Sequence, residues 1–292
     1  MARVALVLKC LPEISLEALK DHTKGLLPLL KLSSASLDVI ITDKITNSDR
    51  LDCVLGNLYS NIREVLLIEN LYETPINVLF NQEDDWLKSH AWDLLLVGVE
   101  LPSLANYNYK KLKKVDLTSK NTSANERLYL DTEQHDLGLY SVSALGGTFD
   151  HLHDGHKILL SVAVFLTSHR LIVGVADHEL LKNKKFPEFL ESFESRAQNV
   201  KNFVARTKPT LQLEIVALRD VCGPTGAVPE IQSLIVSRET ESGGEMVNAV
   251  RKEKGLPGLE VHVVNVLGGQ EEDNWNEKLS STELRKRKVV EN

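Results

Sequence analysis

The second half of the chain alternates short apolar runs with longer amphipathic stretches, and this pattern restricts the fold more than any other feature. Strands that alternate with helices form parallel sheets covered on both faces. We therefore expect an α/β fold over residues 138–292, with a Rossmann-like, doubly wound parallel sheet of about five strands. The expected strands are Tyr140–Leu145, Leu171–Ala176, Leu211–Ala217, Ser233–Ser237 and Leu259–Leu267, and the expected helices are His156–Ser168, Phe193–Thr207 and Gly244–Glu253.

The first hundred residues repeat this alternation on a smaller scale. A helix is predicted over Ser15–Lys31, behind a serine cap. Residues 1–100 are therefore predicted to form a small α/β domain. No phosphate loop, metal-ligand spacing or nucleophile arrangement occurs in it, so we expect a structural or partner-docking role. The predicted strands are Ala2–Leu8, Leu37–Thr42, Glu64–Ile68 and Trp92–Val99.

The segment 101–137 between the two halves is polar and loses apolar periodicity, which predicts a linker or a long loop. It contains the run KKLKK at Lys110–Lys114. Such a run is either a docking patch for an acidic partner or a solvated group of charges, and the second interpretation is favoured.

Charge and cysteine content exclude several classes of protein. The net charge of -7, with both signs spread along 292 residues, argues against a surface devoted to nucleic acid or to an anionic membrane. Cys10, Cys53 and Cys222 lie far apart without a C-x-x-C pair, so neither a disulfide framework nor a cysteine zinc site is predicted. No secretory leader and no apolar stretch of about 20 residues occurs. We expect a cytoplasmic protein.

The segment Gly146–Lys157, GGTFDHLHDGHK, follows the first strand of the second half and leads into a helix near Gly155. A glycine turn lets the backbone approach an anion, and a helix start offers N–H groups and a positive dipole end. Thr148 adds a hydroxyl. His153 and His156 are three residues apart, which places both imidazoles on one helix face. Donors arranged around an α-phosphate stabilise the transition state of its transfer, so the segment predicts a nucleotide-phosphate site.

These residues also allow interpretations that do not involve a nucleotide. One histidine at a helix start is more often a surface or cap residue. Phosphate binding is favoured because a glycine turn, a threonine and two histidines at helical spacing occur together after a strand. A zinc site from His151, His153 and His156 lacks a carboxylate or thiolate at a familiar spacing. Lys157 is predicted to face the surface, and no P-loop or dinucleotide-binding glycine motif occurs elsewhere.

The motif G-G-T-F-D-x-L-H-x-G-H, followed by Ser280-Ser281-Thr282-x-x-Arg285, resembles nucleotidylyltransferases with an (H/T)-x-G-H loop and a C-terminal S-S-T-x-x-R motif. Between the two motifs, VGVADHELLKNK, VSRETESGG and VCGPTG are similar to eukaryotic phosphopantetheine adenylyltransferases, including the adenylyltransferase part of bifunctional CoA synthase. The resemblance covers about residues 139–287.

The resemblance implies roles for individual residues. The catalytic histidines would be His153 and His156, with Thr148 orienting the two reacting phosphates. Lys182 would bind the acceptor phosphate, although Lys184 and Lys185 lie close enough in sequence to compete for that role. The implied ATP-binding residues are Gly147, Thr148, Phe149, His153, His156, Arg238, Ser280, Ser281, Thr282 and Arg285.

Some of these roles have structural alternatives. Ser280 and Glu283 match the S-x-x-E capping box, which explains them as helix-start residues, although a capped helix start also binds anions. Arg238 stands where bacterial relatives keep an arginine for ATP, but eukaryotic relatives do not uniformly keep one. Arg196 is interpreted as a salt-bridged surface residue.

The implied activity is transfer of AMP from ATP to 4'-phosphopantetheine in coenzyme A synthesis, by direct in-line attack and with Mg²⁺ accompanying ATP. Association with other coenzyme A enzymes is implied as well. Alternatives within the superfamily are a nicotinamide mononucleotide, flavin or phospho-alcohol acceptor. A class I aminoacyl-tRNA synthetase is disfavoured, because no K-M-S-K-S-like sequence and no basic surface occur. A catalytically silent ATP-binding scaffold is the alternative of a different class.

Overall fold

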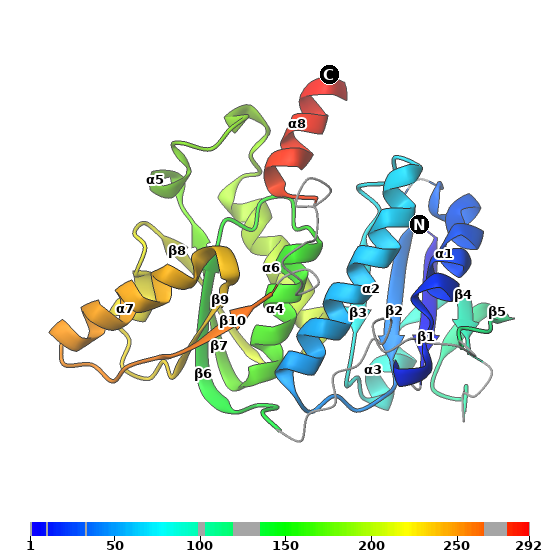
Figure 1. Ribbon diagram of the computed structural model, residues 1–292, viewed down its shortest axis with the longest axis horizontal. Coiled ribbons are helices and arrows are strands. Elements are labelled where there is room, and N and C mark those ends of the chain that lie inside the picture. The colour runs from blue at the N-terminus through cyan, green and yellow to red at the C-terminus, as the bar shows by residue number, and fades with distance from the viewer. Residues whose placement is uncertain are drawn as a thin grey trace. The chain divides into compact units, whose positions relative to one another are not determined.

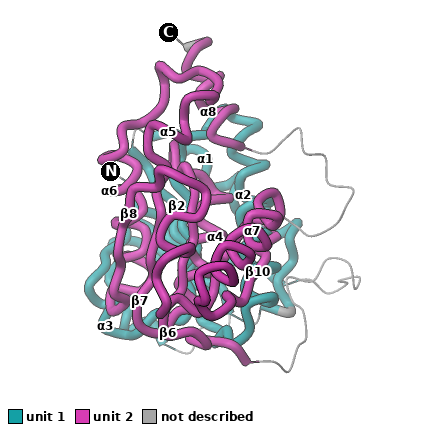
Figure 2. Tube along the Cα trace, turned by 90° about the vertical axis from the view of Figure 1, so that its left-hand side faces the viewer, with its two compact units in different colours: residues 1–134 teal, residues 135–292 magenta. Residues whose placement is uncertain are grey.

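The computed structural model describes residues 2–9, 11–32, 34–98, 103–118, 135–265 and 279–291. The chain divides into two compact units, residues 1–134 and 135–292 (Figure 2). Each unit contains a five-stranded sheet in which the assigned strand pairs are parallel. Helices flank the strands in both units (Figure 1). The predicted Rossmann-like α/β class is confirmed.

The sheet of the first unit has the order β3-β2-β1-β4-β5. Its central strand is β1 (Arg3–Leu8), which lies between β2 (Ser36–Ile41) and β4 (Ala91–Val97). The outer strands are β3 (Ile76–Leu79) and β5 (Asn108–Lys114). Three of the predicted strands are thus confirmed within a residue or two, and β3 was not predicted.

The helices of this unit are α1 (Leu16–Leu30), α2 (Ser48–Ile68) and α3 (Asp84–Ser89). The predicted cap of α1 is confirmed, because the Ser15 hydroxyl accepts a hydrogen bond from the Ala18 amide. The strand predicted over residues 64–68 is wrong, since these residues form the last turns of α2. Periodicity alone does not distinguish a short apolar run in a buried helix from one in a strand, and here the longer helix determines the conformation.

The predicted linker is wrong where β5 lies. Strand β5 pairs with β4 from Ala91↔Asn108 to Val97↔Lys114, so its backbone hydrogen bonds hold a sequence without apolar alternation. Its lysines are exposed, as expected for a solvated charge run, and Lys110 Nζ lies 2.8 Å from Asp93 Oδ1. Lysines on an edge strand oppose pairing with another chain.

In the second unit the order is β10-β9-β6-β7-β8. The central strand β6 (Tyr140–Gly147) lies between β7 (Thr167–Ala176) and β9 (Ser233–Ser237). The outer strands are β8 (Gln212–Leu218) and β10 (Glu260–Val264). All five predicted strands are confirmed, except that the end of the last prediction, beyond residue 265, lies outside the described residues.

The predicted helices of this unit are found as α4 (Asp154–Leu166), α6 (Phe193–Thr207) and α7 (Glu241–Glu253). Two more helices are α5 (His178–Leu181) and α8 (Ser281–Glu291). Figure 1 shows α4 and α6 on one side of the sheet and α7 on the other. In such a sheet, ligands bind at the carboxyl ends of the strands, beside the central strand where the order reverses. None of the helices in the described part of the chain combines the length and the hydropathy that a membrane span requires.

Helix α4 is buried along almost its whole length and packs against β6, β7, β9 and α6. Each buried aliphatic or aromatic side chain of this kind contributes about 1.5–3 kcal/mol of transfer free energy. Lys157 lies within this buried helix at 6 % exposure, so its predicted surface position is wrong. The helix that follows the glycine segment is therefore fixed firmly to the sheet.

Candidate active site

The glycines at the end of β6 make room for neighbouring side chains. A Cβ atom on Gly146 would lie 2.9 Å from the Leu218 side chain, and one on Gly147 would lie 3.1 Å from the Phe149 ring. Neither glycine has a positive φ. Gly146 remains exposed, so the backbone at the end of the central strand is open to a ligand, as the sequence predicts.

The next residues have unusual backbone conformations. Phe149 and His151 have φ values of 52° and 46°, a region that non-glycine residues adopt rarely and mostly at functional sites. Phe149 is fully buried, and its ring centroid lies 5.2 Å from that of His156. The Phe149 ring therefore packs inside the protein and supports His156.

His153 and His156 stand together at the start of α4. Their rings are stacked, with centroids 3.8 Å apart and planes 27° apart. The prediction that both imidazoles share one helix face is confirmed. Burial, and then the nearby His153 and Lys184, hold the pKa of His156 well below its usual value of 6.5. Its buried Nδ1 has no hydrogen-bond partner among the described residues. His156 is therefore a neutral imidazole with one N–H to donate.

Distant segments hold the loop between Gly147 and α4. Arg196 Nη1 donates to the Thr148 carbonyl at 2.7 Å, and the His151 amide donates to Glu191 Oε2 at 2.6 Å. Arg196 is 2 % exposed, so its interpretation as a surface residue is wrong. The Thr148 hydroxyl has no hydrogen-bond partner in the described part of the chain and remains available to a substrate.

Helix α8 also contacts this loop. Ser281 Oγ donates to the Asp150 carbonyl at 2.8 Å, and Arg285 forms an ion pair with the Asp150 carboxylate. Both of these charged side chains are almost completely buried, at 1 % and 0 % exposure. Arg285 also donates from Nε to the Lys185 carbonyl at 2.9 Å. Its guanidinium is thus occupied inside the protein, which differs from the triphosphate contact that the resemblance implies.

The start of α8 shows half of the predicted capping box. The Glu283 amide donates to Ser280 Oγ at 3.2 Å, whereas the Glu283 carboxylate accepts from Arg287 Nε. Thr282 Oγ1 accepts from Arg285 Nη2 at 3.2 Å. The helix begins at Ser281, so the amides of Ser281 and Thr282, ahead of the capped Glu283 amide, have no acceptor within the helix and can receive an anion.

The predicted basic residues lie around the same end of the sheet. Lys182, Lys184 and Lys185 follow α5, just beyond β7, and all three are exposed. Of these, Lys184 is the one whose charge lowers the pKa of His156. Arg238 is exposed at the end of β9 and donates a hydrogen bond to Asn265.

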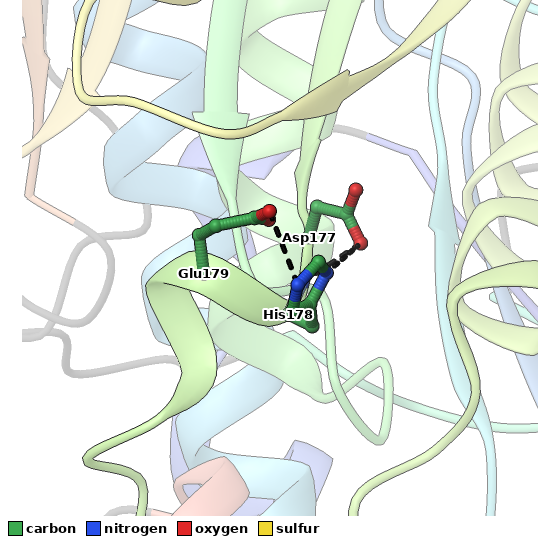
Figure 3. Close-up of side chains that lie close together, drawn as sticks. All are labelled: Asp177, His178 and Glu179. Carbon is green, nitrogen blue, oxygen red and sulfur yellow. Dashed lines mark hydrogen bonds and ion pairs between the residues drawn. The ribbon is translucent and has the colours of Figure 1, made fainter.

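One group of side chains in the described residues is close enough to share a metal ion, and it is not the three histidines of the loop. It consists of Asp177, His178 and Glu179 after β7 (Figure 3). His178 Nδ1 lies 3.4 Å from Asp177, and its Nε2 lies 3.1 Å from Glu179. Asp177 also pairs with Arg219. Asp177 is partly buried and the other two residues are exposed, and acidic groups of this kind are common on protein surfaces without an ion.

Comparison with known proteins places this site in a family. A cytidylyltransferase-like family model matches residues 144–287. The phosphopantetheine adenylyltransferase of Saccharomyces cerevisiae is 44% identical over 98% of this chain and 93% of its own length. The chain belongs to the phosphopantetheine adenylyltransferase family. The family member of Methanopyrus kandleri is 37% identical over 48% of this chain and 86% of its own length, and that of Pyrococcus abyssi is 30% identical over 48% and 86%.

Asp150 and Glu191 hold the histidine loop in place, and the sequence predicted no role for either of them. Asp150 lies in the first motif and Arg285 in the second, so an acidic and a basic residue in two motifs of one site was the available signal for their ion pair. Glu191 carries no such signal, because its contacts with the loop depend on how the segment between α5 and α6 folds back.

Proposed function

We infer that this protein transfers AMP from ATP to 4'-phosphopantetheine, giving dephospho-CoA and pyrophosphate in coenzyme A biosynthesis. The observation that carries this inference is the 44% identity with the yeast enzyme of that name along almost the whole of both chains. The stacked pair of His153 and the neutral His156, beside an open strand end, supplies a fitting site. A silent scaffold would have no need to keep Thr148, both histidines and the start of α8.

The reaction begins with a nucleophile that is already anionic at neutral pH, so no general base is required. An oxygen of the phosphopantetheine phosphate attacks the α-phosphorus of ATP. The bond from that phosphorus to the oxygen bridging to the β-phosphate breaks, and pyrophosphate leaves with the electron pair. The enzyme's task is to align the two phosphates and to stabilise the charge that develops between them.

Each loop residue has a part in this step. His153 and His156 donate to the oxygens of the α-phosphate, where negative charge grows in the transition state. The Thr148 hydroxyl orients the two reacting phosphates, and the partly exposed backbone at Gly147 lets them approach. A neutral His156 keeps this function over the physiological pH range, because its lowered pKa prevents a change of charge.

The remaining basic and hydroxyl groups hold the ends of the two substrates. Ser280, Ser281 and Thr282 present the first amides of α8 to the β- and γ-phosphates. Lys182 binds the phosphate of phosphopantetheine, and Lys184, which lies near His156, shares the charge on the reacting phosphates. Arg238 contacts ATP from the end of β9.

Mg²⁺ bound to ATP would offset part of the charge of the triphosphate. The loop side chains are imidazole and hydroxyl donors that fit phosphate oxygens, and the carboxylate of Asp150 is engaged by Arg285. Mg²⁺ commonly retains several waters and binds through substrate phosphates, which fits a site with few free carboxylates.

We place the reaction in the cytoplasm. The first unit would there provide a surface on which other coenzyme A enzymes dock.

The test is to incubate the purified protein with ATP and Mg²⁺, and to follow pyrophosphate release with a panel of acceptors. The panel contains phosphopantetheine, nicotinamide mononucleotide, flavin mononucleotide and a phospho-alcohol. We expect rapid release with phosphopantetheine alone, and dephospho-CoA as the product by mass. Faster release with another acceptor would move the assignment to that substrate, and no release with any acceptor would favour the silent scaffold.

A further inference from the structure

Asp150 is the central residue of the strained part of the histidine loop. It lies between Phe149 and His151, the two residues with left-handed backbone conformations, and it is fully buried. A buried carboxylate requires a partner of opposite charge or several hydrogen bonds. Asp150 has both, because Arg285 contacts its Oδ2 and the Glu191 amide donates to its Oδ1 at 2.9 Å.

Arg285 joins three segments that are far apart in the sequence. From α8 it reaches Asp150 across 135 residues, and its Nε donates to the carbonyl of Lys185 across 100 residues. Ser281, at the start of the same helix, adds its hydrogen bond to the Asp150 carbonyl. One guanidinium thereby links the loop with the histidines, the segment with the lysines and helix α8, whose first amides would bind the triphosphate.

We propose that Asp150 and Arg285 are positioning residues, whose ion pair locks the histidine loop to α8 so that both ends of the triphosphate are held in one register. Arg285 then acts on catalysis through Asp150 and does not bind the phosphates itself. This proposal rests on the proposed function. The physical reason is that donors aimed at a developing charge must be fixed in advance, and a displacement of about 1 Å costs about 100-fold in rate.

A double-mutant cycle tests the proposal, with the variants Asp150→Asn, Arg285→Met and the two combined. We expect each single change to lower kcat by about 100-fold, while the Kd for ATP stays within about three-fold of the wild type. The double variant should be no slower than the singles, because both changes break one shared contact. Arg287→Met is the matched control, since Arg287 pairs with Glu283 on the more exposed side of α8 and should leave kcat unchanged.

Two outcomes would overturn the proposal. If Arg285→Met weakens ATP binding while Asp150→Asn behaves like the wild type, Arg285 is a phosphate ligand. If all three variants turn over like the wild type, the ion pair contributes to folding alone. A single variant that does not fold is replaced by the double variant, which leaves no uncompensated buried charge, and by Arg285→Lys, which keeps the charge but not the forked geometry.

Imidazole NMR resonances of His153 and His156 separate this proposal from the proposed function. If the wild type makes no dephospho-CoA, the proposed function fails, but the positioning role can still be measured. We expect both imidazole signals to shift in Asp150→Asn and Arg285→Met and to stay in place in Arg287→Met. Signals that remain at their wild-type positions in all variants contradict the positioning role, whatever the activity.

Discussion

The two units share one strand order and differ in the loop that follows their first strand. In both, the first strand is central, the second and fourth flank it, and the third and fifth lie at the edges. After β1 the chain continues into a 3-10 turn over Leu11–Glu13 and then into α1. After β6 it continues through Thr148 to the stacked histidines of α4. Equivalent positions in the same topology therefore carry different side chains.

The side chains in these two loops explain why one end of a sheet is a candidate site and the other is not. In the first unit, Leu11 and Ile14 are buried, at 0 % and 3 % exposure, so apolar packing fills the position. In the second unit, Thr148, His153 and His156 keep polar atoms at the same place, none of these residues is fully buried, and distant contacts fix the backbone. A fold provides a place for a ligand, and the residues in one loop provide the chemistry.

The sharpest test of this difference is His156→Ala. We expect kcat to fall by about 100- to 1000-fold, the usual effect of removing one preorganised donor, with little change in the KM for ATP. Steady-state assays of pyrophosphate release measure both constants. His169→Ala is the control, because His169 is exposed near the amino-terminal end of β7. Unchanged turnover in His156→Ala would mean that the loop's chemistry does not distinguish the two units.

The lysines after α5 are a second feature that distinguishes the second unit from the first. The charge of Lys184 lowers the pKa of His156, so this lysine lies close to the proposed catalytic histidine. Losing one charged hydrogen bond costs about 1.5–3 kcal/mol, or about 10- to 100-fold. We expect this loss in kcat for Lys184→Ala, and in the KM for phosphopantetheine for Lys182→Ala. Lys201→Ala, on an exposed face of α6, is the matched control. If the Lys184 variant keeps its full kcat and the Lys182 variant loses it, the two roles are exchanged.

The features of the site that depend on neighbouring residues in the chain were predictable from the sequence. The contacts between distant segments, which form only on folding, were not. The five strands of the second unit and the stacked pair His153 and His156 follow from periodicity, which the structure preserves. The burial of Arg196 and Arg285 does not, because an arginine is usually a surface residue and its partners here are backbone carbonyls and one distant carboxylate. The β5 strand was missed for a related reason, since its pairing with β4 and not its own composition defines it.

A pH experiment tests whether the His156 imidazole is shielded from water and neutral. The unfolded chain binds a proton near pH 6.5, whereas the folded chain keeps His156 neutral to lower pH, so acid favours the unfolded state below about pH 6.5. We expect the opening free energy of α4 to fall by up to about 1.4 kcal/mol between pH 6.5 and 5.5. Hydrogen exchange of the α4 amides measures it. His156→Gln should lose this dependence and His169→Gln should keep it. If the opening free energy of α4 changes equally with pH in the wild type and both variants, the His156 imidazole is exposed to water and its pKa is not lowered.

The smallest expected effect comes from removing the first unit. Residues 135–292 form a compact unit, and the archaeal relative is matched over 86% of its own length by only 48% of this chain. Because the catalytic groups we propose all lie in the second unit, we expect the fragment 135–292 to keep kcat within about three-fold of the full chain. Assays of both proteins with phosphopantetheine measure this. A fragment that is folded by circular dichroism and binds ATP, yet forms no dephospho-CoA, would show that the first unit takes part in catalysis despite its closed loop.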